Sequence, residues 1–285
     1  MSQVASPVIA VADGVVALGR GARRGSGVVL GPGRVVTLGH HLVSDRVETF
    51  VAGGRSREAR VIGVDRVVGV AVLEVPTGDA PAVNWADRTP AIGARVFALG
   101  NPGTGLRVTE GRVSAQAVTI RMRGRPLEAI EHTAPMPRGA GGGPLVDESG
   151  SVLGLNALRG EPQFLLALPA AAVRAAIDRV TEGRQPPRLG IALVPPRASR
   201  RMRRAVGLPD RDGLLVRAVE DGSPAAKAGV HAGDLLVRLG DDELGAIDDL
   251  FAALDARAGA PSVGLRIIRA TEESDLTLEL SGDQP

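Results

Sequence analysis

Short apolar stretches separated by turn-forming residues run through the first part of the chain, from Val8 to about Leu168. Most contain five to eight residues rich in Val, Ile and Leu, as in SGVVLGPGRVVTLG and ARVFALGNPG. Gly, Pro, Asp or Asn stands between them, a pattern typical of an all-β barrel or sandwich. The N-terminal segment MSQVASPVIAVADG predicts a first strand, and Leu145–Leu155 predicts a hairpin around Asp147–Gly150.

A helix is predicted where this part of the chain ends. Its apolar positions, Val173, Ala176, Ile177 and Val180, follow the i, i+3, i+4, i+7 spacing of one helical face. The sequence EGRQPP at residues 182–187 then predicts the end of the helix and a linker.

Beyond the linker the pattern becomes mixed α and β. Leu214–Val219 predicts a strand, and Ser223 before Pro224 predicts a helix cap, with Gly229 closing that short helix. A second helical face is predicted from Ile247 to Leu254, and strands are predicted at Val263–Ile268 and Leu276–Leu280.

Composition narrows the classes of function. The chain of 285 residues carries 34 basic and 32 acidic residues, a net charge of +2, which argues against strong nucleic-acid binding. It contains no cysteine, which excludes disulfides, thiolate nucleophiles and zinc–thiolate sites. Four histidines without metal-ligand spacing predict no zinc site, and no cofactor is expected.

The N-terminal segment does not resemble a signal peptide, because it lacks a basic start and Asp13 interrupts its apolar run. No apolar run approaches the length of about 18 residues that crosses a bilayer. The sequence therefore predicts a cytoplasmic protein without a membrane span.

Several motifs in order resemble the HtrA (Deg) group of trypsin-like serine proteases. GSGVVLGPGRVVTLGHHLV is similar to the strands that lead to the catalytic histidine, and VIGVDRVVGVAVLEV to the strand that carries the aspartate. FALGNPG, TEGRVSA, PRGAGGGPLVDESGSVLGLN and LLALP follow at the expected places, and RLGIAL with GLLVRAVEDGSPAAKAGVHAGDLLVRL resembles a PDZ domain. The resemblance implies a chymotrypsin-type double β-barrel followed by a PDZ domain.

The resemblance places the catalytic triad on three positions of this chain. The histidine falls on His40, the aspartate on Gly69 and the serine nucleophile on Gly141. Glycine can neither attack a carbonyl nor accept a proton, so two of the three members are missing. Gly139 and Gly141 remain candidates for an oxyanion hole made of backbone N–H groups. His40 is either a peptide-binding residue or a remnant of the triad.

A few other side chains are candidate replacements for the missing triad members. Ser149 and Ser151 lie in the predicted hairpin and are expected to point away, whereas Ser114 and Thr133 stay open as alternative nucleophiles. Asp65 is four residues from Gly69, about 13 Å in an extended strand, which is too far to orient His40.

The PDZ resemblance implies a peptide groove. Leu189, Gly190 and Ile191 fall on the loop whose backbone receives a peptide carboxylate, and the helix with Leu250 and Leu254 forms the other wall. The apolar lining favours peptides or protein C-termini with hydrophobic ends. Core packing of the same residues is the alternative.

Arginines cluster on a predicted short helix. They are Arg197, Arg200, Arg201, Arg203 and Arg204. The cluster either binds an acidic partner or forms a solvated helix face, and the scarcity of aromatic residues favours the solvated face.

The sequence as a whole predicts a mainly β protein. A trypsin-like double β-barrel is expected over residues 1–182, a linker over 183–187 and a small α+β PDZ domain over 188–282. We expect a catalytically inactive HtrA homologue, not an enzyme, that acts as a peptide-binding scaffold or regulator. The alternatives are an unconventional serine-type endopeptidase and a binder of acidic polymers. An active protease relative is a candidate partner, and the resemblance implies a trimer.

Overall fold

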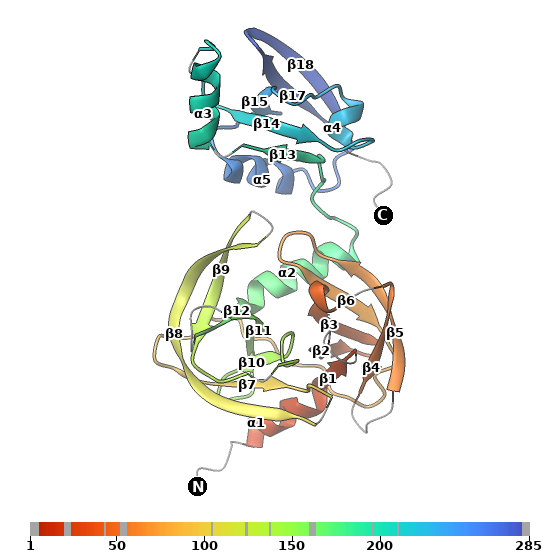
Figure 1. Ribbon diagram of the computed structural model, residues 1–285. Helices are drawn as coiled ribbons and strands as arrows, with labels where there is room; N and C mark the ends of the chain where they lie inside the picture. Colours follow the sequence, from red (N-terminus) through yellow and green to blue (C-terminus); the bar gives the residue numbers. More distant parts are fainter. Residues whose placement is uncertain are drawn as a thin grey trace. The chain divides into compact units, whose positions relative to one another are not determined.

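The computed structural model describes residues 6–19, 24–42, 44–51, 56–103, 105–122, 125–136, 138–159, 164–194, 196–209 and 211–280. The chain divides into two compact units, Met1–Gly183 and Arg184–Pro285. The first unit is mainly β and the second has helices against a sheet (Figure 1). No helix among the described residues is long and apolar enough to cross a membrane.

The first unit opens with a closed barrel. Its strands, in the order in which they pair, are β1 (Val15–Leu18), β2 (Gly25–Gly31), β3 (Arg34–Leu38), β6 (Val70–Glu74), β5 (Ser56–Val64) and β4 (Arg46–Phe50). Val16, Leu18 and Leu73 fill its interior and are fully buried. The run of β-branched and aliphatic residues that the sequence showed is therefore the inner wall of a barrel.

A second closed barrel completes the first unit. Its strands pair in the order β10 (Pro144–Val146), β11 (Val152–Arg159), β12 (Leu165–Pro169), β9 (Arg125–His132), β8 (Arg107–Met122) and β7 (Arg95–Gly100). Helix α2 (Ala170–Thr181) packs Val173 and Ala176 against Leu155 and Leu168 of this barrel. Residues of the first barrel, including Val36 and Val70, belong to the same cluster, so the two barrels share a core.

Trp85, the single tryptophan of the chain, lies between the barrel sequences and is half-buried. It makes an isolated parallel bridge with Val152 and packs against a cluster that contains Phe97.

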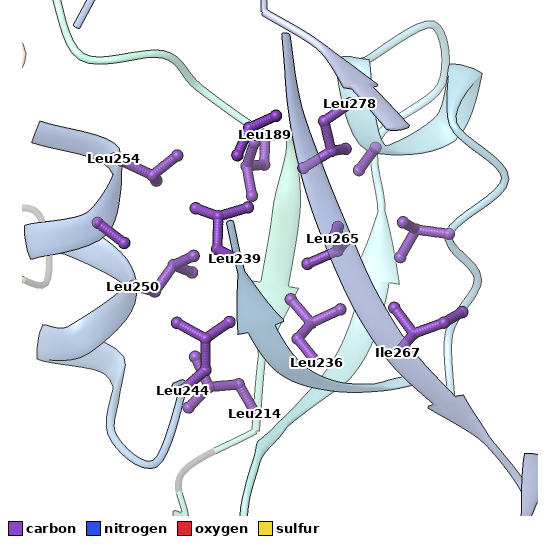
Figure 2. Packing of buried hydrophobic residues seen from close by; sticks show 14 of the residues in the cluster. Leu189, Leu214, Leu236, Leu239, Leu244, Leu250, Leu254, Leu265, Ile267 and Leu278 are labelled. Carbon is purple, nitrogen blue, oxygen red and sulfur yellow. The ribbon is translucent and has the colours of Figure 1, made fainter. Parts of the chain in front are cut away.

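The second unit is a sheet flanked by helices. The strand order is β13 (Ile191–Leu193), β14 (Leu214–Val219), β15 (Leu235–Leu239), β17 (Ser262–Arg269) and β18 (Glu272–Glu279), and β16 (Asp242–Glu243) also pairs with β15. The helices are α3 (Pro196–Ala205), α4 (Pro224–Lys227) and α5 (Ile247–Asp255). Leucines of the sheet and of α5 interdigitate in one core, as Figure 2 shows for Leu239, Leu250 and Leu265.

The local signals read from the sequence agree with these elements in most places. The hairpin around Asp147–Gly150 is confirmed by the pairing of β10 with β11, and Ser223 caps α4 by accepting from the Ala226 N–H at 3.2 Å. The predicted N-terminal strand is wrong. Ser6–Ala10 form helix α1 and Val11–Gly14 a 3-10 turn, with Val8 fully buried. An apolar run of this length is compatible with either structure, and packing decides between them.

Candidate functional site

A glycine-rich loop, Gly139–Gly143, joins the end of β9 to β10 and forms the floor of the candidate site. Both barrels hold it in place. From β2, the Ser26 N–H donates to the Gly141 carbonyl at 2.7 Å and the Ser26 hydroxyl to the Gly139 carbonyl at 3.0 Å. From β11, the Asn156 carbonyl accepts from the Gly142 N–H at 2.7 Å. The loop conformation is therefore fixed by side chains and backbone outside it.

The glycines of this loop differ in how strongly the fold requires them. A Cβ built on Gly142 would lie 2.2 Å from the Ser26 carbonyl oxygen, and one on Gly143 would lie 2.1 Å from that of Leu99. A Cβ on Gly141 meets nothing closer than 3.4 Å. Glycine is thus sterically required at 142 and 143, whereas position 141 has room for a side chain.

The amides at the start of the loop are available to a ligand. Within the described part of the chain, neither the Gly139 nor the Gly141 N–H donates a hydrogen bond. Gly139 has φ +86°, a left-handed conformation that glycine adopts without strain. A pair of unengaged backbone donors beside an open position is the arrangement that stabilises negative charge on a carbonyl oxygen.

Two histidines lie beside the loop. His40 and His41 belong to a 3-10 turn, Gly39–His41, that follows β3, and their ring centroids are 4.3 Å apart in an edge-to-face arrangement. The resemblance assigned the triad histidine to His40. The structure instead brings His41 against Gly141, because a Cβ built there would lie 3.4 Å from His41 Nε2. His40 is exposed.

The electrostatic state of these rings follows from their burial. Burial lowers the pKa of His41 to about 4, with a further contribution from His40. Burial also lowers the pKa of His40. Both rings therefore prefer the neutral form at neutral pH. The His41 Nδ1 atom is 3.5 Å from the Thr37 hydroxyl, which donates to the Ser26 carbonyl at 2.7 Å.

Gly69 occupies the position assigned to the aspartate and ends the turn before β6. It adopts φ +73°, and its N–H donates to the Asp65 carbonyl at 3.0 Å. A Cβ built there would have only the Met122 sulfur within 4 Å, at 3.6 Å. The position is open but left-handed, which disfavours most side chains.

Asp65 is committed to a structural role. Its carboxylate is fully buried, accepts from the Val67 and Val68 N–H groups at 3.0 and 2.7 Å, and pairs with Arg179 of α2 at 2.7 Å. It therefore fixes the turn that carries Gly69, and it is not placed to orient a histidine.

The hydroxyls that the sequence left open as nucleophiles are engaged elsewhere. Ser114 donates to Glu131 at 2.7 Å, and Thr133 bonds the Arg112 backbone. Ser149 donates to Asp147 and lies 3.0 Å from Ser151, within the hairpin turn. Among the described residues, none of these hydroxyls forms a hydrogen bond with His41 or with the glycine loop. Thr37 and Ser26, which do contact that region, were not identified from the sequence, because a buried strand hydroxyl carries no distinguishing pattern.

In the second unit, the loop Leu189–Ile191 is held by α4 and by the segment that precedes it. The Leu189 carbonyl accepts from Ala225 and the Gly190 carbonyl from Glu220. Gly190 has φ +73°, and a Cβ built on it would lie 2.2 Å from the Ser223 Cβ. β13, which begins at Ile191, pairs with β14 alone among the described strands, and so leaves one edge unpaired.

The predicted groove residues divide into two groups. Leu189, Leu250 and Leu254 are at most 4% exposed and meet in the core, as Figure 2 shows. The structure therefore favours the core alternative for these three side chains. Ile191, the first residue of β13, and Ile247, the first residue of α5, are half-buried against the same core and keep some exposed surface.

The arginine cluster lies on α3 but does not form a single face. Arg203 is 3% exposed and is oriented toward the Pro209 carbonyl, whereas Arg200 pairs with Asp212. Arg201 is exposed, and the side chain of Arg197 lies outside the described residues. Among the residues that the structure describes, no three His, Asp or Glu side chains are grouped so as to hold a metal ion.

Comparisons with known proteins agree with this geometry. The model of the trypsin-like peptidase domain matches residues 25–155, and that of the PDZ domain matches residues 187–280. A probable periplasmic serine endoprotease, DegP-like, of Brucella suis is 27% identical over 277 residues, covering 90% of this chain and 52% of the relative. A putative serine protease HhoB of Synechocystis is 33% identical over 234 residues, covering 76% of this chain and 56% of the relative. The chain thus spans about half the length of these curated relatives.

Solved structures show the same fold. The serine endoprotease of Yersinia pestis superposes with a TM-score of 0.73 at 24% identity, covering 98% of this chain and 97% of that one. The HtrA-type protease AlgW with a decapeptide superposes with a TM-score of 0.73 at 21% identity, covering 98% of both chains.

These comparisons correct one prediction. We expected from the two glycines that the chain is not an enzyme, but the matched relatives are named serine proteases or endoproteases, and they point to a protease. The prediction rested on the absence of two side chains and took no account of the neutral His41 or of the room at position 141.

Proposed function

Because the chain is a homologue of the HtrA-type serine proteases, with a trypsin-like peptidase domain followed by a PDZ domain, we propose that it is a slow endopeptidase that uses water in place of a serine nucleophile. The observation that carries the proposal is the open position beside His41. A side chain at residue 141 would lie 3.4 Å from His41 Nε2, and glycine leaves that space to solvent.

His41 is the general base of this proposal. The Thr37 hydroxyl gives its own proton to the Ser26 carbonyl, so its oxygen can accept from the His41 Nδ1–H. That tautomer leaves the Nε2 lone pair directed at the open position. Thr37 thereby replaces the missing carboxylate as a positioning residue, over a long contact of 3.5 Å and without its negative charge.

The reaction is a one-step addition of water followed by loss of the amine. The water oxygen attacks the peptide carbonyl carbon while Nε2 of His41 takes a water proton. The Gly139 and Gly141 N–H groups receive the oxyanion. His41 then returns the proton to the leaving nitrogen, the C–N bond breaks, and a carboxylic acid and an amine result.

The expected rate is low. Residual catalysis by serine proteases that lack a triad member is on the order of 10³–10⁴ over uncatalysed hydrolysis. A base whose pKa is about 4 has a low proton affinity, which reduces the expected rate further. The same low pKa keeps His41 unprotonated, and so competent, throughout the neutral range.

The second unit supplies binding affinity. The unpaired edge of β13 can accept a peptide as an added strand, and the backbone at Gly190 can receive its terminal carboxylate. The half-buried Ile191 and Ile247 favour a hydrophobic terminal side chain. The match of this chain to the PDZ domain model and the decapeptide in the AlgW structure support this part of the proposal.

Long incubation with unfolded casein, followed by mass analysis of the products, tests the chemistry. We expect slow cleavage that a sulfonyl fluoride does not inhibit, because no serine is acylated. His41→Ala is expected to abolish it, whereas His40→Ala is the matched control and is expected to retain it. Absence of products, or products that persist in His41→Ala, would overturn the proposal.

A further inference from the structure

Arg24 lies directly against the glycine loop. A Cβ built on Gly139 would lie 3.0 Å from the Arg24 Cγ and 3.3 Å from its Cδ, so the stem of this side chain rests on the loop backbone. The guanidinium Nη1 donates to the Pro102 carbonyl at 3.4 Å. Pro102 itself borders the same loop, at 3.2 Å from the built Cβ. Arg24 is therefore held beside the glycine loop by its contact with Gly139 and by its hydrogen bond to Pro102.

The charge of Arg24 is not neutralised by a protein carboxylate. It is exposed and has no ion pair within the described part of the chain, and the same is true of Arg138, which precedes the loop. One hydrogen bond to a carbonyl leaves most of the five guanidinium donors available to a ligand.

Among the described residues, the other groups of the site add no negative charge. Position 69, assigned by resemblance to the triad aspartate, is glycine, and Asp65 is turned inward to Arg179. His41 is neutral at neutral pH. The rim of the loop therefore carries positive charge that its own surroundings leave uncompensated.

We infer that Arg24 makes this site selective for polypeptide segments that carry Asp or Glu next to the residue held by the glycine loop. The inference rests on the proposed function for the location of the substrate, and it concerns binding rather than bond cleavage. A carboxylate of the peptide matches the planar fork of the Arg24 guanidinium. A lysine or a neutral side chain at the same place in the peptide does not match it.

The expected selectivity is modest because the pair is exposed to solvent. Exposed ion pairs contribute up to about 1 kcal/mol, which corresponds to a factor of about 5 in affinity. We therefore expect a Glu-containing peptide to bind about fivefold more tightly than its Gln counterpart, and the difference to shrink as salt is raised.

The test uses the full chain and three fluorescent peptides that differ at one internal position, which is Glu, Gln or Lys. All are amidated at the C-terminus, so that they lack the carboxylate that a PDZ loop receives. Fluorescence anisotropy measures their affinities for the natural protein, for Arg24→Gln and for Arg24→Glu. Arg34→Gln, at the opposite end of β3 from His40, is the matched control.

Loss of the Glu preference in Arg24→Gln, its reversal toward Lys in Arg24→Glu and its retention in Arg34→Gln would support the inference. Equal affinities for the three peptides, or a preference that survives Arg24→Gln, would overturn it. Selective binding without cleavage would refute the proposed hydrolysis alone, and cleavage without charge preference would refute the role of Arg24 alone.

Discussion

The difference between Gly141 and Gly142 leads to a quantitative prediction about serine substitutions at the two positions. Gly142 has φ +83°, and a left-handed non-glycine residue costs roughly 1–2 kcal/mol. The new Cβ would also lie 2.2 Å from the Ser26 carbonyl oxygen, and such overpacking costs typically 1–3 kcal/mol. We expect Gly142→Ser to lower the free energy of unfolding by about 3 kcal/mol.

Gly141→Ser is expected to behave differently. Its φ is not left-handed, and the nearest atom to the new Cβ is His41 Nε2 at 3.4 Å. Replacing glycine also reduces the entropy of the unfolded chain, which stabilises by about 0.4–1 kcal/mol where the native conformation is compatible. The free energy of unfolding should therefore change by less than about 1 kcal/mol.

Urea denaturation followed by circular dichroism measures both values. A serine at 141 should in addition place its hydroxyl beside Nε2 of His41 and make the protein sensitive to a sulfonyl fluoride. Equal destabilisation by the two substitutions would refute the steric reasoning. A stable Gly141→Ser protein that does not react with the reagent would refute the placement of His41.

Three further predictions concern other parts of the molecule. Arg179→Met should lower the free energy of unfolding by about 3 kcal/mol in urea denaturation, because it leaves the buried Asp65 carboxylate without its cation; Arg174→Met, at an exposed pair, is the control. Burial lowers the pKa of His132 to about 4, opposed in part by Asn156, so the fold favours its neutral form. The free energy of unfolding should therefore be highest above pH 6.5 and fall toward pH 4, and His132→Leu should reduce that dependence without removing it, because the pKa of His41 is lowered over the same range. Gly190→Val should abolish binding of peptides with a free C-terminus in a calorimetric titration, since φ +73° and a 2.2 Å approach to Ser223 exclude a side chain; unchanged affinity would contradict the assignment of the loop.

Local patterns were sufficient for the mainly β character of the first part and for several turns and caps, whereas the double barrel and the PDZ domain were expected from the resemblance. Residues such as Ser223 before Pro224, or the turn at Asp147–Gly150, act through neighbours a few positions away, and the structure confirms them. The N-terminal strand was mispredicted because Val8 is buried by a tertiary contact that no local pattern encodes.

The site was less predictable because its geometry depends on residues distant in the sequence. The motif identified positions 69 and 141, but it could not show that the ring of His41, rather than that of His40, lies against the loop. Nor could it show that Arg24 rests on Gly139, 115 positions farther along the chain, because nothing in either local sequence requires the contact. The reason given from the sequence for excluding Asp65 was wrong, because residues 65–69 form a turn and not an extended strand; the carboxylate is instead committed to Arg179 and to the backbone of that turn.

The placement of Trp85 determines what an optical experiment on this protein can detect. The chain has no tyrosine, so emission excited near 295 nm originates entirely from this indole, which lies within the first unit. Its bridge to Val152 makes the signal sensitive to the packing of the second barrel. Intrinsic fluorescence therefore follows the unfolding of the peptidase domain, whereas the PDZ domain contributes no tryptophan fluorescence. A fluorescence transition that differs from the dichroism transition would reveal that the two domains melt independently.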